Sequence, residues 1–320
     1  MIRPRALGPG SRVAVIAPGG PVVKARMEAG LDRLRTLGFE PVPGENLYKR
    51  HLHLAGLDDE RLSDLIWSLT DPQIHGVICA RGGEGATALL PWLEAASVEP
   101  RVFCGYSDIT AIHAWLQRNG WVTFHGPMVA VEMANEGFDV NSFIGEVTGV
   151  RTDHSIPVRF LKPGQADGVL SGGCLSLLAS LAGTEWSLPW TGRSILLIED
   201  TGEPPYKLHR MLTQLRDSHS LRDVQGIIFG TMEKCAAEAG DGFTLDEVLL
   251  DALKGFEGPV AMGLPVGHCA QPVLTLPLGT KVLLAPDDPE PGAVSPDRLS
   301  GRLHLTELGV TEDVVIDLDE

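Results

Sequence analysis

The chain has 320 residues, 43% of them hydrophobic, and a formal net charge of −16 at pH 7. At roughly 100–200 residues per domain, this length predicts two domains or one large one, with enough apolar residues for a sizeable core. A chain this acidic has no electrostatic reason to bind phosphate backbones, so we expect no nucleic acid as its main ligand.

The N-terminal segment and the cysteines favour a cytoplasmic protein. We also expect it to use no metal ion and no cofactor. Residues 1–20 contain no long apolar core and no small-residue cleavage site, so we expect no signal peptide. No stretch approaches the roughly 20 apolar residues that span a bilayer, so we expect no membrane partner. No CxxC or HExxH motif occurs, and the pair His51 and His53 is typical of a surface turn. The odd number of widely spaced cysteines predicts reduced, mostly buried thiols. They are Cys79, Cys104, Cys174, Cys235 and Cys269.

Short apolar strands alternate with helical patterns through the first half of the chain. The predicted elements are strand 12–17, helix 24–37, strand 39–42, helix 58–69, strand 76–80, helix 86–96, strand 102–104, helix 108–119 and strand 122–125. Such alternation predicts a parallel sheet covered by helices on both faces. Sheets of this kind place their sites at the carboxyl ends of the strands.

The pattern decays between residues 138 and 167 into polar sequence with Pro and Gly. We therefore predict an N-terminal domain over residues 1–140, a linker over 141–167 and a C-terminal domain over 168–320. The elements predicted after the linker are helix 174–181, strand 194–198, helix 206–218, strand 226–230 and short β segments at 273–277, 281–285 and 302–305. The sequence thus predicts an α/β fold of two domains.

A glycine-rich loop, Arg81-Gly82-Gly83-Glu84-Gly85, follows the third predicted strand. Without Cβ atoms the backbone there can turn sharply and present N–H groups to a negatively charged oxygen, aided by the positive end of the next helix. The spacing Gly83-x-Gly85-x-x-Ala88, with Asp108 about 20 residues further on, is close to a dinucleotide-binding fingerprint. No Walker lysine follows, however, and the loop does not come after the first strand. A tight strand-to-helix turn without a ligand is the alternative interpretation.

A second loop, Gly105-Tyr106-Ser107-Asp108, connects an apolar strand to a predicted helix. A serine on such a turn can expose its Oγ above the sheet, while the next backbone N–H contributes to an oxyanion hole. The alternative is that Ser107 or Asp108 caps the helix. The loop does not fit the G-x-S-x-G elbow, because Ile109 replaces the second glycine.

Two further loops carry carboxylates and an imidazole. Glu199 and Asp200 end an apolar strand, where a carboxylate pair can orient an imidazole or bind a cation. The alternative is a polar loop in which Glu203 is simply solvated. His268 lies in a Gly/Pro loop between apolar segments, although most single histidines are surface or satisfied residues. Together with Ser107, these loops supply the three groups of a nucleophilic triad, whose order along the chain does not matter.

Several separate motifs, in one order, resemble a known family. They are "APGG", "DDERLSDLIWSLTDPQIHGVICARGGEGA", "CGYSDITAIHAWL", "TFHGPM", "SGGCLSLLASLAGTEW", "LLIEDTGEPPYKLHRMLTQL" and "GLPVGHCAQPVLTLPLG". Over nearly its whole length the chain resembles the L,D-carboxypeptidases of bacterial peptidoglycan recycling (murein tetrapeptide carboxypeptidases), serine peptidases whose family includes the microcin C immunity peptidases. The resemblance implies a parallel, Rossmann-like α/β N-terminal domain and a β-rich C-terminal domain, with the active site in the groove between them.

The resemblance also implies roles for individual residues. By position, Ser107 would be the nucleophile, His268 the general base and Glu199 its orienting partner. Glu199 is preferred to Asp200 and Glu203 because the family's glutamate begins the Glu-Asp pair after this strand.

Further residues follow from the same motifs. The backbone N–H groups of Asp108 and of Gly82 or Gly83 would form the oxyanion hole. Arg81 is a candidate for binding the substrate's free carboxylate, with a structural ion pair as the alternative. Glu84 is a second candidate substrate-binding residue, because its loop borders the groove.

Four positions depart from the family's pattern. Glu84 stands where tyrosine is usual, Cys174 where asparagine is usual, His209 where aspartate is usual and Gly19 where serine is frequent. None of them belongs to the implied triad, but Glu84 and Cys174 bear on substrate preference.

The expected reaction is hydrolysis of the L,D-amide bond of a murein tetrapeptide, which releases the C-terminal D-amino acid, D-Ala. The family precedent implies a homodimer. One alternative is cleavage of acyl-adenylate analogues, with Trp186 and Trp190 as candidate stacking partners. Another is a nucleotide-binding module that uses Gly83-x-Gly85. The sequence leaves open which diamino acid is preferred at the scissile position.

Overall fold

The chain forms two compact units, each with its own sheet. The computed structural model describes residues 1–93, 98–135, 137–151, 154–188, 192–238, 240–270, 272–287 and 300–311. The first unit comprises residues 1–152, 271–279 and 308–320, and the second comprises residues 153–270 and 280–307. The predicted α/β class, with a parallel first sheet and a β-rich second half, is confirmed.

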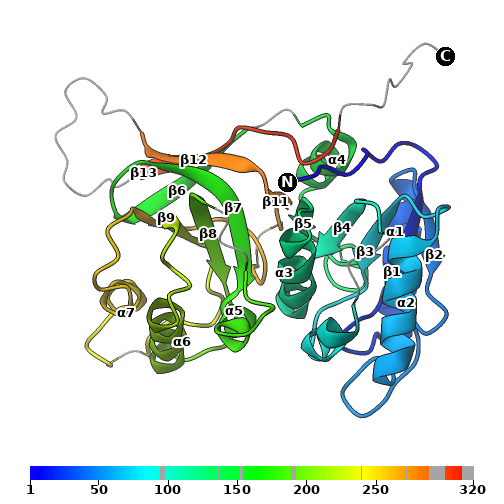
Figure 1. Cartoon of the computed structure of the whole chain (residues 1–320), viewed down its shortest axis with the longest axis horizontal. Helices are drawn as coiled ribbons and strands as arrows, with labels where there is room; N and C mark the ends of the chain where they lie inside the picture. The colour runs from blue at the N-terminus through cyan, green and yellow to red at the C-terminus, as the bar shows by residue number, and fades with distance from the viewer. Residues whose placement is uncertain are drawn as a thin grey trace. The chain divides into compact units, whose positions relative to one another are not determined.

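The sheet of the first unit is parallel except at one edge (Figure 1). Its order is β11 (Leu276–Leu278), β5 (Thr123–His125), β4 (Val102–Gly105), β3 (Gly76–Cys79), β1 (Arg12–Ile16) and β2 (Glu40–Pro43). Only β11 runs antiparallel, against β5. The central strands β1, β3, β4 and β5 are buried almost throughout, which explains why they read in the sequence as unbroken apolar runs.

Helices flank this parallel sheet, as the alternating pattern predicts. α1 (Lys24–Thr36) contacts β2, α2 (Asp58–Thr70) contacts β1 and β3, and α3 (Thr110–Arg118) contacts β5. The helix predicted over 86–96 is wrong in type: a 3₁₀ helix, η1, runs over Ala86–Trp92 and contains Pro91. Proline has no N–H for an α-helical bond, which accounts for the difference. Residues 94–97 lie outside the described part of the chain.

The sheet of the second unit closes on itself. Its order is β10 (Val260–Met262), β6 (Ser155–Lys162), β13 (Ser300–Leu305), β12 (Lys281–Pro286), β7 (Ala166–Cys174), β8 (Ser194–Glu199) and β9 (Val224–Phe229), which pairs again with β10. β7, β8, β9 and β10 are parallel neighbours, and the other pairs are antiparallel. α5 (Leu175–Leu181), α6 (Pro205–Asp217) and α7 (Leu245–Ala252) pack side by side outside it (Figure 1).

Residues 141–167, predicted as a linker, carry regular structure at both ends. α4 (Val140–Thr148) belongs to the first unit, and β6 together with the start of β7 belongs to the second. The short β segment predicted at 273–277 appears as β11, which pairs with the first sheet although it follows most of the second unit in the chain.

Candidate active site

Ser107 lies on a strained turn at the carboxyl end of β4. Tyr106 is still extended, and Ser107 then takes a φ of 65°, in the left-handed region that favours glycine. A short 3₁₀ helix, η2 (Ser107–Ile109), leads directly into α3. Left-handed backbone at a non-glycine residue costs about 1–3 kcal/mol and is retained mainly at functional sites. The serine is therefore held half-buried at the end of a central strand, where parallel sheets place their sites.

The glycine-rich loop packs directly against this serine. A Cβ atom on Gly82 would lie 2.7 Å from Ser107 Cβ, 2.9 Å from Ser107 Oγ and 3.2 Å from the backbone N of Asp108. Among the described residues, none accepts a hydrogen bond from the N–H groups of Gly82 and Gly83. Glycine is needed at position 82 for this close approach, and the loop leaves donors available beside the serine.

Asp108 does not cap the helix that follows it. Neither η2 nor α3 has a side-chain capping bond. The Asp108 carboxylate instead accepts a hydrogen bond of 2.9 Å from the backbone N–H of Ala86, just after the glycine-rich loop. The capping alternative for Ser107 and Asp108 is therefore wrong, because this contact is made across the sheet edge and not along the chain.

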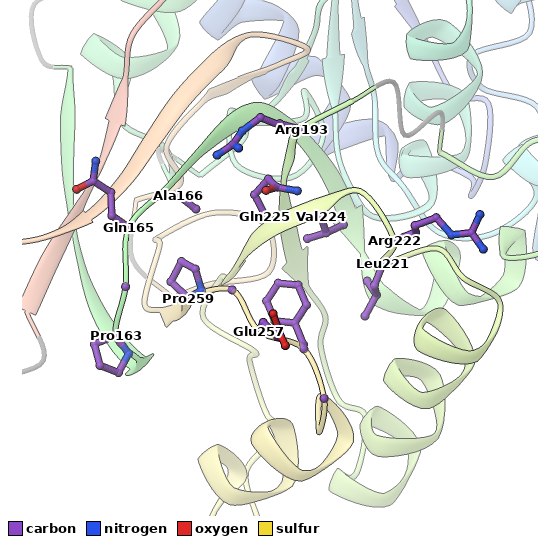
Figure 2. A pocket seen from close by; sticks show the side chains of 14 residues that line it. Pro163, Gln165, Ala166, Arg193, Leu221, Arg222, Val224, Gln225, Glu257 and Pro259 are labelled. Carbon is purple, nitrogen blue, oxygen red and sulfur yellow. The ribbon is translucent and has the colours of Figure 1, made fainter.

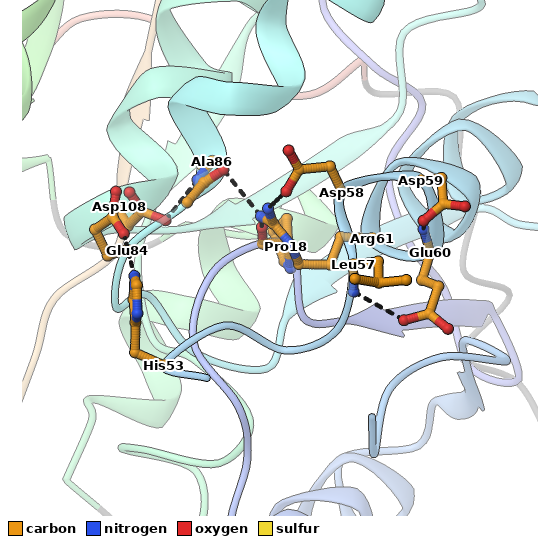
Figure 3. Close-up of polar contacts among 11 residues, drawn as sticks. Pro18, His53, Leu57, Asp58, Asp59, Glu60, Arg61, Glu84, Ala86 and Asp108 are labelled. Carbon is orange, nitrogen blue, oxygen red and sulfur yellow. Dashed lines mark hydrogen bonds and ion pairs between the residues drawn. The ribbon is translucent and has the colours of Figure 1, made fainter. Parts of the chain in front are cut away.

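Arg81 and Glu84 point to different neighbours on the same loop. Arg81 is half-buried, and its Nη1 donates to the carbonyl of Pro21 at 3.1 Å. Glu84 is exposed, and its Oε2 lies 2.9 Å from His53 Nε2, within hydrogen-bonding distance (Figure 3). His53 lies on the surface as predicted.

Arg61 is a buried cation of this site that the sequence interpretation missed. Its side chain is 0% exposed, and it donates to the carbonyls of Pro18 and Gly85, the latter at 2.9 Å, and to Asp58 at 2.5 Å (Figure 3). It shares the inward face of α2 with Leu65 and Leu69, at i+4 and i+8. A cation at a core-facing position of an amphipathic helix is the signal that could have identified it.

The dinucleotide fingerprint is not supported by the local geometry. In that motif the helix N-terminus binds a pyrophosphate and the acidic residue binds a ribose. Here the Asp108 carboxylate itself occupies the Ala86 N–H, and Gly85 is followed by the 3₁₀ helix η1. The acid and the helix start thus satisfy each other.

In the second unit, Glu199 and His268 form an acid–imidazole pair in which the carboxylate is buried and the ring is half-buried. Glu199 ends β8 and is 1% exposed. Its Oε2 lies 2.8 Å from His268 Nδ1 and also accepts the backbone N–H of His268 at 3.2 Å. Nδ1 must carry a hydrogen to donate to the carboxylate, so in the neutral ring Nε2 is the unprotonated nitrogen. The His268 side chain is 23% exposed, which leaves part of the ring accessible.

Two glycines make room for this pair. Gly267 has a φ of 70°, and a Cβ atom there would collide with the Glu199 carboxylate. Gly230 follows β9, and a Cβ atom on it would lie 3.0 Å from Glu199 Cβ. His268 is selected in the sequence because it lies in a Gly/Pro loop. The glycine of that loop lets the backbone and the ring of His268 approach Glu199 closely.

Asp200 and Glu203, the other carboxylates of this loop, have different partners. The Asp200 oxygens accept the backbone N–H groups of Ser176, at the start of α5, and of Thr201, each at 2.8 Å. Glu203 pairs with Lys207 at 3.0 Å, one turn along at the start of α6. Only Glu199, of the three, contacts His268 in the described structure.

Two of the departures from the family pattern also lie in the second unit. Cys174 ends β7 in register with Glu199, is buried, and places Sγ 3.2 Å from Ser176 Oγ. Burial, with the nearby Glu199 charge, raises the pKa of its thiol well above the usual value. His209 lies on the exposed side of α6, with Nε2 3.1 Å from Asp251 on α7.

A cavity of about 560 Å³ lies in the second unit (Figure 2). Its lining includes Ala166, Arg193, Val224 and Pro259, at or just before the first residues of the parallel strands β7, β8, β9 and β10. Glu199 is at the opposite end of β8. The cavity is therefore not part of the acid–imidazole site.

Other sequence expectations concern metals, membranes and thiols. Among the described residues, no group of His, Cys, Asp and Glu side chains is arranged to hold a metal ion. Within the same part of the chain, no helix combines the length and the hydrophobicity that crossing a bilayer would require. None of the five cysteines takes part in a disulfide in the described structure, and four of them are buried, as predicted.

Comparison with known families matches both halves of the chain. The family described as "LD-carboxypeptidase N-terminal domain" matches residues 13–126, and the family described as "LD-carboxypeptidase C-terminal domain" matches residues 167–284. The matched segments contain Ser107 and its glycine loop in the first case, and Glu199 and His268 in the second.

Three relatives illustrate the sequence similarity. A Bacillus subtilis protein named "Probable murein peptide carboxypeptidase" is 35% identical over 292 residues, 88% of this chain and 91% of its own length. The murein tetrapeptide carboxypeptidase of Pseudomonas aeruginosa is 33% identical over 273 residues, 81% of this chain and 89% of its own. The microcin C7 self-immunity protein MccF of Escherichia coli is 28% identical over 306 residues, 84% and 88% of the two chains.

Solved structures share the fold over almost the whole chain. The muramoyltetrapeptide carboxypeptidase from Oxalobacter formigenes matches with a TM-score of 0.79 and 28% identity, covering 94% of this chain and 100% of that one. The wild-type apo structure of MccF matches with a TM-score of 0.83 and 24% identity, covering 97% and 100%. The chain belongs to the LD-carboxypeptidase (S66) family of serine peptidases and is a carboxypeptidase.

Proposed function

We propose that the protein is a serine L,D-carboxypeptidase that hydrolyses the L,D-amide bond of murein tetrapeptides and releases the C-terminal D-Ala. The observation that carries the mechanism is the 2.8 Å contact between Glu199 Oε2 and His268 Nδ1, which prepares Nε2 as a base. The substrate class is supported by the relatives named as murein peptide and murein tetrapeptide carboxypeptidases.

The proposed reaction proceeds through an acyl-enzyme. His268 Nε2 takes the proton of Ser107 Oγ as that oxygen attacks the carbonyl carbon of the L-centre of the diamino acid. The tetrahedral intermediate collapses, the C–N bond breaks, and His268 gives its proton to the leaving amine of D-Ala. Water then attacks the ester, with His268 as base again, and Ser107 is regenerated. Glu199 holds the imidazole in the required tautomer and stabilises the imidazolium.

The oxyanion would be held by backbone N–H groups of the first unit. Asp108, beside Ser107, would supply one donor, and Gly82 or Gly83 would supply the other. The close packing of Gly82 on Ser107 and the absence of a competing acceptor for the two glycine N–H groups among the described residues support this assignment. One such donor typically contributes roughly 3–4 kcal/mol to stabilising the transition state.

Recognition of a free C-terminal carboxylate needs a cation near the scissile bond. We assign this role to Arg81, whose Nη1 is fixed by the Pro21 carbonyl and which begins the glycine-rich loop. Glu84, in the same loop, would face the amino-bearing part of the substrate. Its exposed side chain, 66% accessible, supports this, because an accessible carboxylate can pair with an ammonium group.

A second candidate substrate is an acyl-adenylate analogue. MccF is a relative at 28% identity, and one MccF structure is described as a complex with aspartyl sulfamoyl adenosine. Trp186 would be the stacking residue in that case, while Trp190 lies outside the described residues.

The biological setting follows from the same proposal. A tetrapeptide-trimming peptidase of this class would act in peptidoglycan recycling in the cytoplasm, which the free, mostly buried cysteines support. We also propose a homodimer, from the family precedent.

The substrate is tested by mass spectrometry of digests. Wild-type protein and Ser107→Ala are incubated with the tetrapeptide Ala-γ-Glu-diamino acid-D-Ala and, separately, with an aminoacyl sulfamoyl adenosine. Release of D-Ala by the wild type only is the expected result. Near-wild-type release of D-Ala by Ser107→Ala would contradict the proposed role of Ser107. Turnover of the adenosine compound but not of the tetrapeptide would show that the substrate is an acyl-adenylate analogue.

The triad is tested by covalent labelling. The proposal requires the His268 imidazole of the second unit to activate Ser107 of the first. An acylating probe should therefore label Ser107 in the wild type, with the rate falling on the order of 10³-fold in His268→Ala. His209→Ala is the control, because the His209 ring contacts Asp251 on the exposed side of α6. In this variant Ser107 should be labelled at the wild-type rate. Equal labelling rates in the wild type and in His268→Ala would show that His268 does not activate Ser107.

A further inference from the structure

The proposed mechanism uses the backbone of Asp108 but gives its side chain no role. That side chain is nevertheless only 1% exposed, and its Oδ2 accepts the backbone N–H of Ala86 at 2.9 Å (Figure 3). We propose that the Asp108 carboxylate is a positioning group for the reaction, which holds the glycine-rich loop 81–85 against the turn that carries Ser107. The inference rests on the proposed role of Ser107 as nucleophile.

The contacts around Asp108 form a closed ring. Asp108 follows Ser107 in the chain, its carboxylate bonds to Ala86 at the end of the glycine-rich loop, and Gly82 at the start of that loop packs back on Ser107 Cβ and Oγ. Both ends of the loop therefore contact the turn that carries Ser107. Because one of these contacts is made by the Asp108 carboxylate, that carboxylate fixes where the N–H groups of Gly82 and Gly83 lie relative to the serine oxygen.

The loop after β1 supports the ring from the other side. Gly20 N donates to the carbonyl of Gly82 at 2.9 Å. Gly19 lies so close to the Asp108 carboxylate that a Cβ atom there would collide with Oδ2. The carboxylate is therefore enclosed by the two loops whose spacing determines the geometry at the serine.

The charge on this carboxylate opposes folding stability. Burial raises the pKa of Asp108 from its usual 3.8 to about 6, with the Glu84 charge acting in the same direction and the Ala86 N–H and Arg61 acting against it. Cys79 also faces Asp108, while His53 pairs with Glu84 at the loop surface. With the pKa raised, the native state binds more protons than the unfolded chain between about pH 4 and 6, so stability from this group falls as the pH rises through that window.

Keeping an ionised carboxylate here has a function in the proposed reaction. An ionised oxygen accepts the Ala86 N–H more strongly than a protonated one. The hydrogen bond that holds the loop is therefore strongest above about pH 6, where the group costs the most stability. A residue that only filled space would gain nothing from this charge.

The test uses Asp108→Asn and Asp108→Ala, with Asp64→Asn as a matched control. Asp64 is also a buried carboxylate that accepts a backbone N–H, from Asn46, and burial also raises its pKa. In Asp108→Ala we expect kcat for D-Ala release to fall on the order of 10²-fold, with KM changed less than about three-fold, because a displaced oxyanion donor affects the transition state and not ground-state binding. Asp108→Asn keeps one acceptor oxygen and should fall in between, and Asp64→Asn should keep the wild-type kcat.

The pH profile supplies a readout that a purely structural role would not change. In the wild type, protonation of Asp108 should add a partial loss of kcat on the acid side of the profile, near pH 6, no larger than the loss caused by Asp108→Asn. In Asp108→Asn this added loss should be absent, and in Asp64→Asn it should stay as in the wild type. Wild-type kcat and an unchanged acid limb in folded Asp108→Asn would overturn the inference, and this variant keeps the test open if Asp108→Ala does not fold.

The inference and the proposed function fail in different ways. If Ser107→Ala keeps wild-type turnover, the proposed function is lost. If Ser107→Ala is inactive while both Asp108 variants match the wild type in kcat and in pH profile, only the positioning role of Asp108 is lost.

Discussion

Gly82 and Ser107 are in such close contact that no side chain fits between them: a Cβ atom on Gly82 would lie 2.7 Å from Ser107 Cβ and 2.9 Å from its Oγ. In real structures non-bonded carbon atoms pack at about 3.5–4.0 Å, so even a methyl group would have to displace one of the two segments. The contact between Gly82 and Ser107 thus fixes the position of the serine relative to the loop that would hold the oxyanion.

Gly82→Ala should damage activity more than stability. Displacing the serine or the loop by part of an ångström is expected to lower kcat for D-Ala release on the order of 10²-fold, and the overpacking should cost about 1–3 kcal/mol of unfolding free energy. Steady-state kinetics and urea unfolding measure the two effects. Gly120→Ala is the control: Gly120 has a φ of 81° and open space around it, so it should lose about 1 kcal/mol of stability and keep its kcat. A folded Gly82→Ala enzyme with wild-type kcat would contradict the prediction.

The left-handed backbone of Ser107 predicts that glycine at this position is more stabilising than alanine, the reverse of the usual order in a helix. Because φ is 65° there, Ser107→Gly removes the steric penalty that Ser107→Ala retains, and it should be more stable by about 0.5–1 kcal/mol in urea unfolding. Ser68 lies in α2 with an ordinary helical backbone, so the same two substitutions there should give the opposite order, with alanine more stable by about 1 kcal/mol. Equal stabilities of the two Ser107 variants would show that the turn is not strained in solution.

The local parts of the site could be predicted from the sequence because they depend on short-range rules. The run Val102–Gly105 reads as a buried strand, and the switch to a helical pattern after Asp108 predicts a strand-to-helix turn, which the structure contains. In the same way, the apolar run before Glu199 places that carboxylate at a strand end, and the Gly/Pro sequence before His268 predicts a loop.

The remaining features depend on contacts between distant segments, for which a single sequence holds no local signal. Asp108 looks like a helix cap because capping is a local pattern, but its partner is Ala86, 22 positions away. Arg61 binds carbonyls of Pro18 and Gly85, and neither spacing nor periodicity indicates those partners. β11 pairs with β5 although about 150 residues separate the two strands in the chain. Such pairings are decided by the packing of the whole unit.

The two neighbouring carboxylates after β8 should respond differently to neutralisation. Glu199 contacts the His268 ring, so Glu199→Gln should lower kcat on the order of 10³-fold or more, because the imidazolium loses its counter-charge. Asp200 accepts backbone N–H groups of Ser176 and Thr201, so Asp200→Asn should cost about 1 kcal/mol of stability and less than ten-fold in kcat. Kinetics of D-Ala release by both variants, with urea unfolding as the control for folding, measure this. Loss of turnover in Asp200→Asn alone would reverse the assignment.

A buried ion pair next to the boundary of the first unit predicts a pH-dependent stability. Glu146 Oε1 and Arg151 Nη1 lie 2.8 Å apart, with only 1% and 5% of the two side chains exposed. Burial raises the pKa of Glu146 from 4.5 to about 7, although Arg151 acts in the opposite direction. The native state therefore binds more protons than the unfolded chain between about pH 4.5 and 7, and the stability from Glu146 falls as the pH rises through this window.

Replacing the arginine should make that fall steeper. In Arg151→Met the ionised Glu146 loses its partner, so its pKa should rise further and the free energy of unfolding should drop by about 3 kcal/mol at pH 8. At pH 5 Glu146 is protonated in the wild type as well, so the loss should be distinctly smaller. Urea unfolding at the two pH values measures the difference. Arg193→Met removes an exposed pair with Asp167, 2.9 Å apart, and should change stability little at either pH. If Arg151→Met loses the same free energy at pH 5 and pH 8, Glu146 does not titrate in this range and the prediction is wrong.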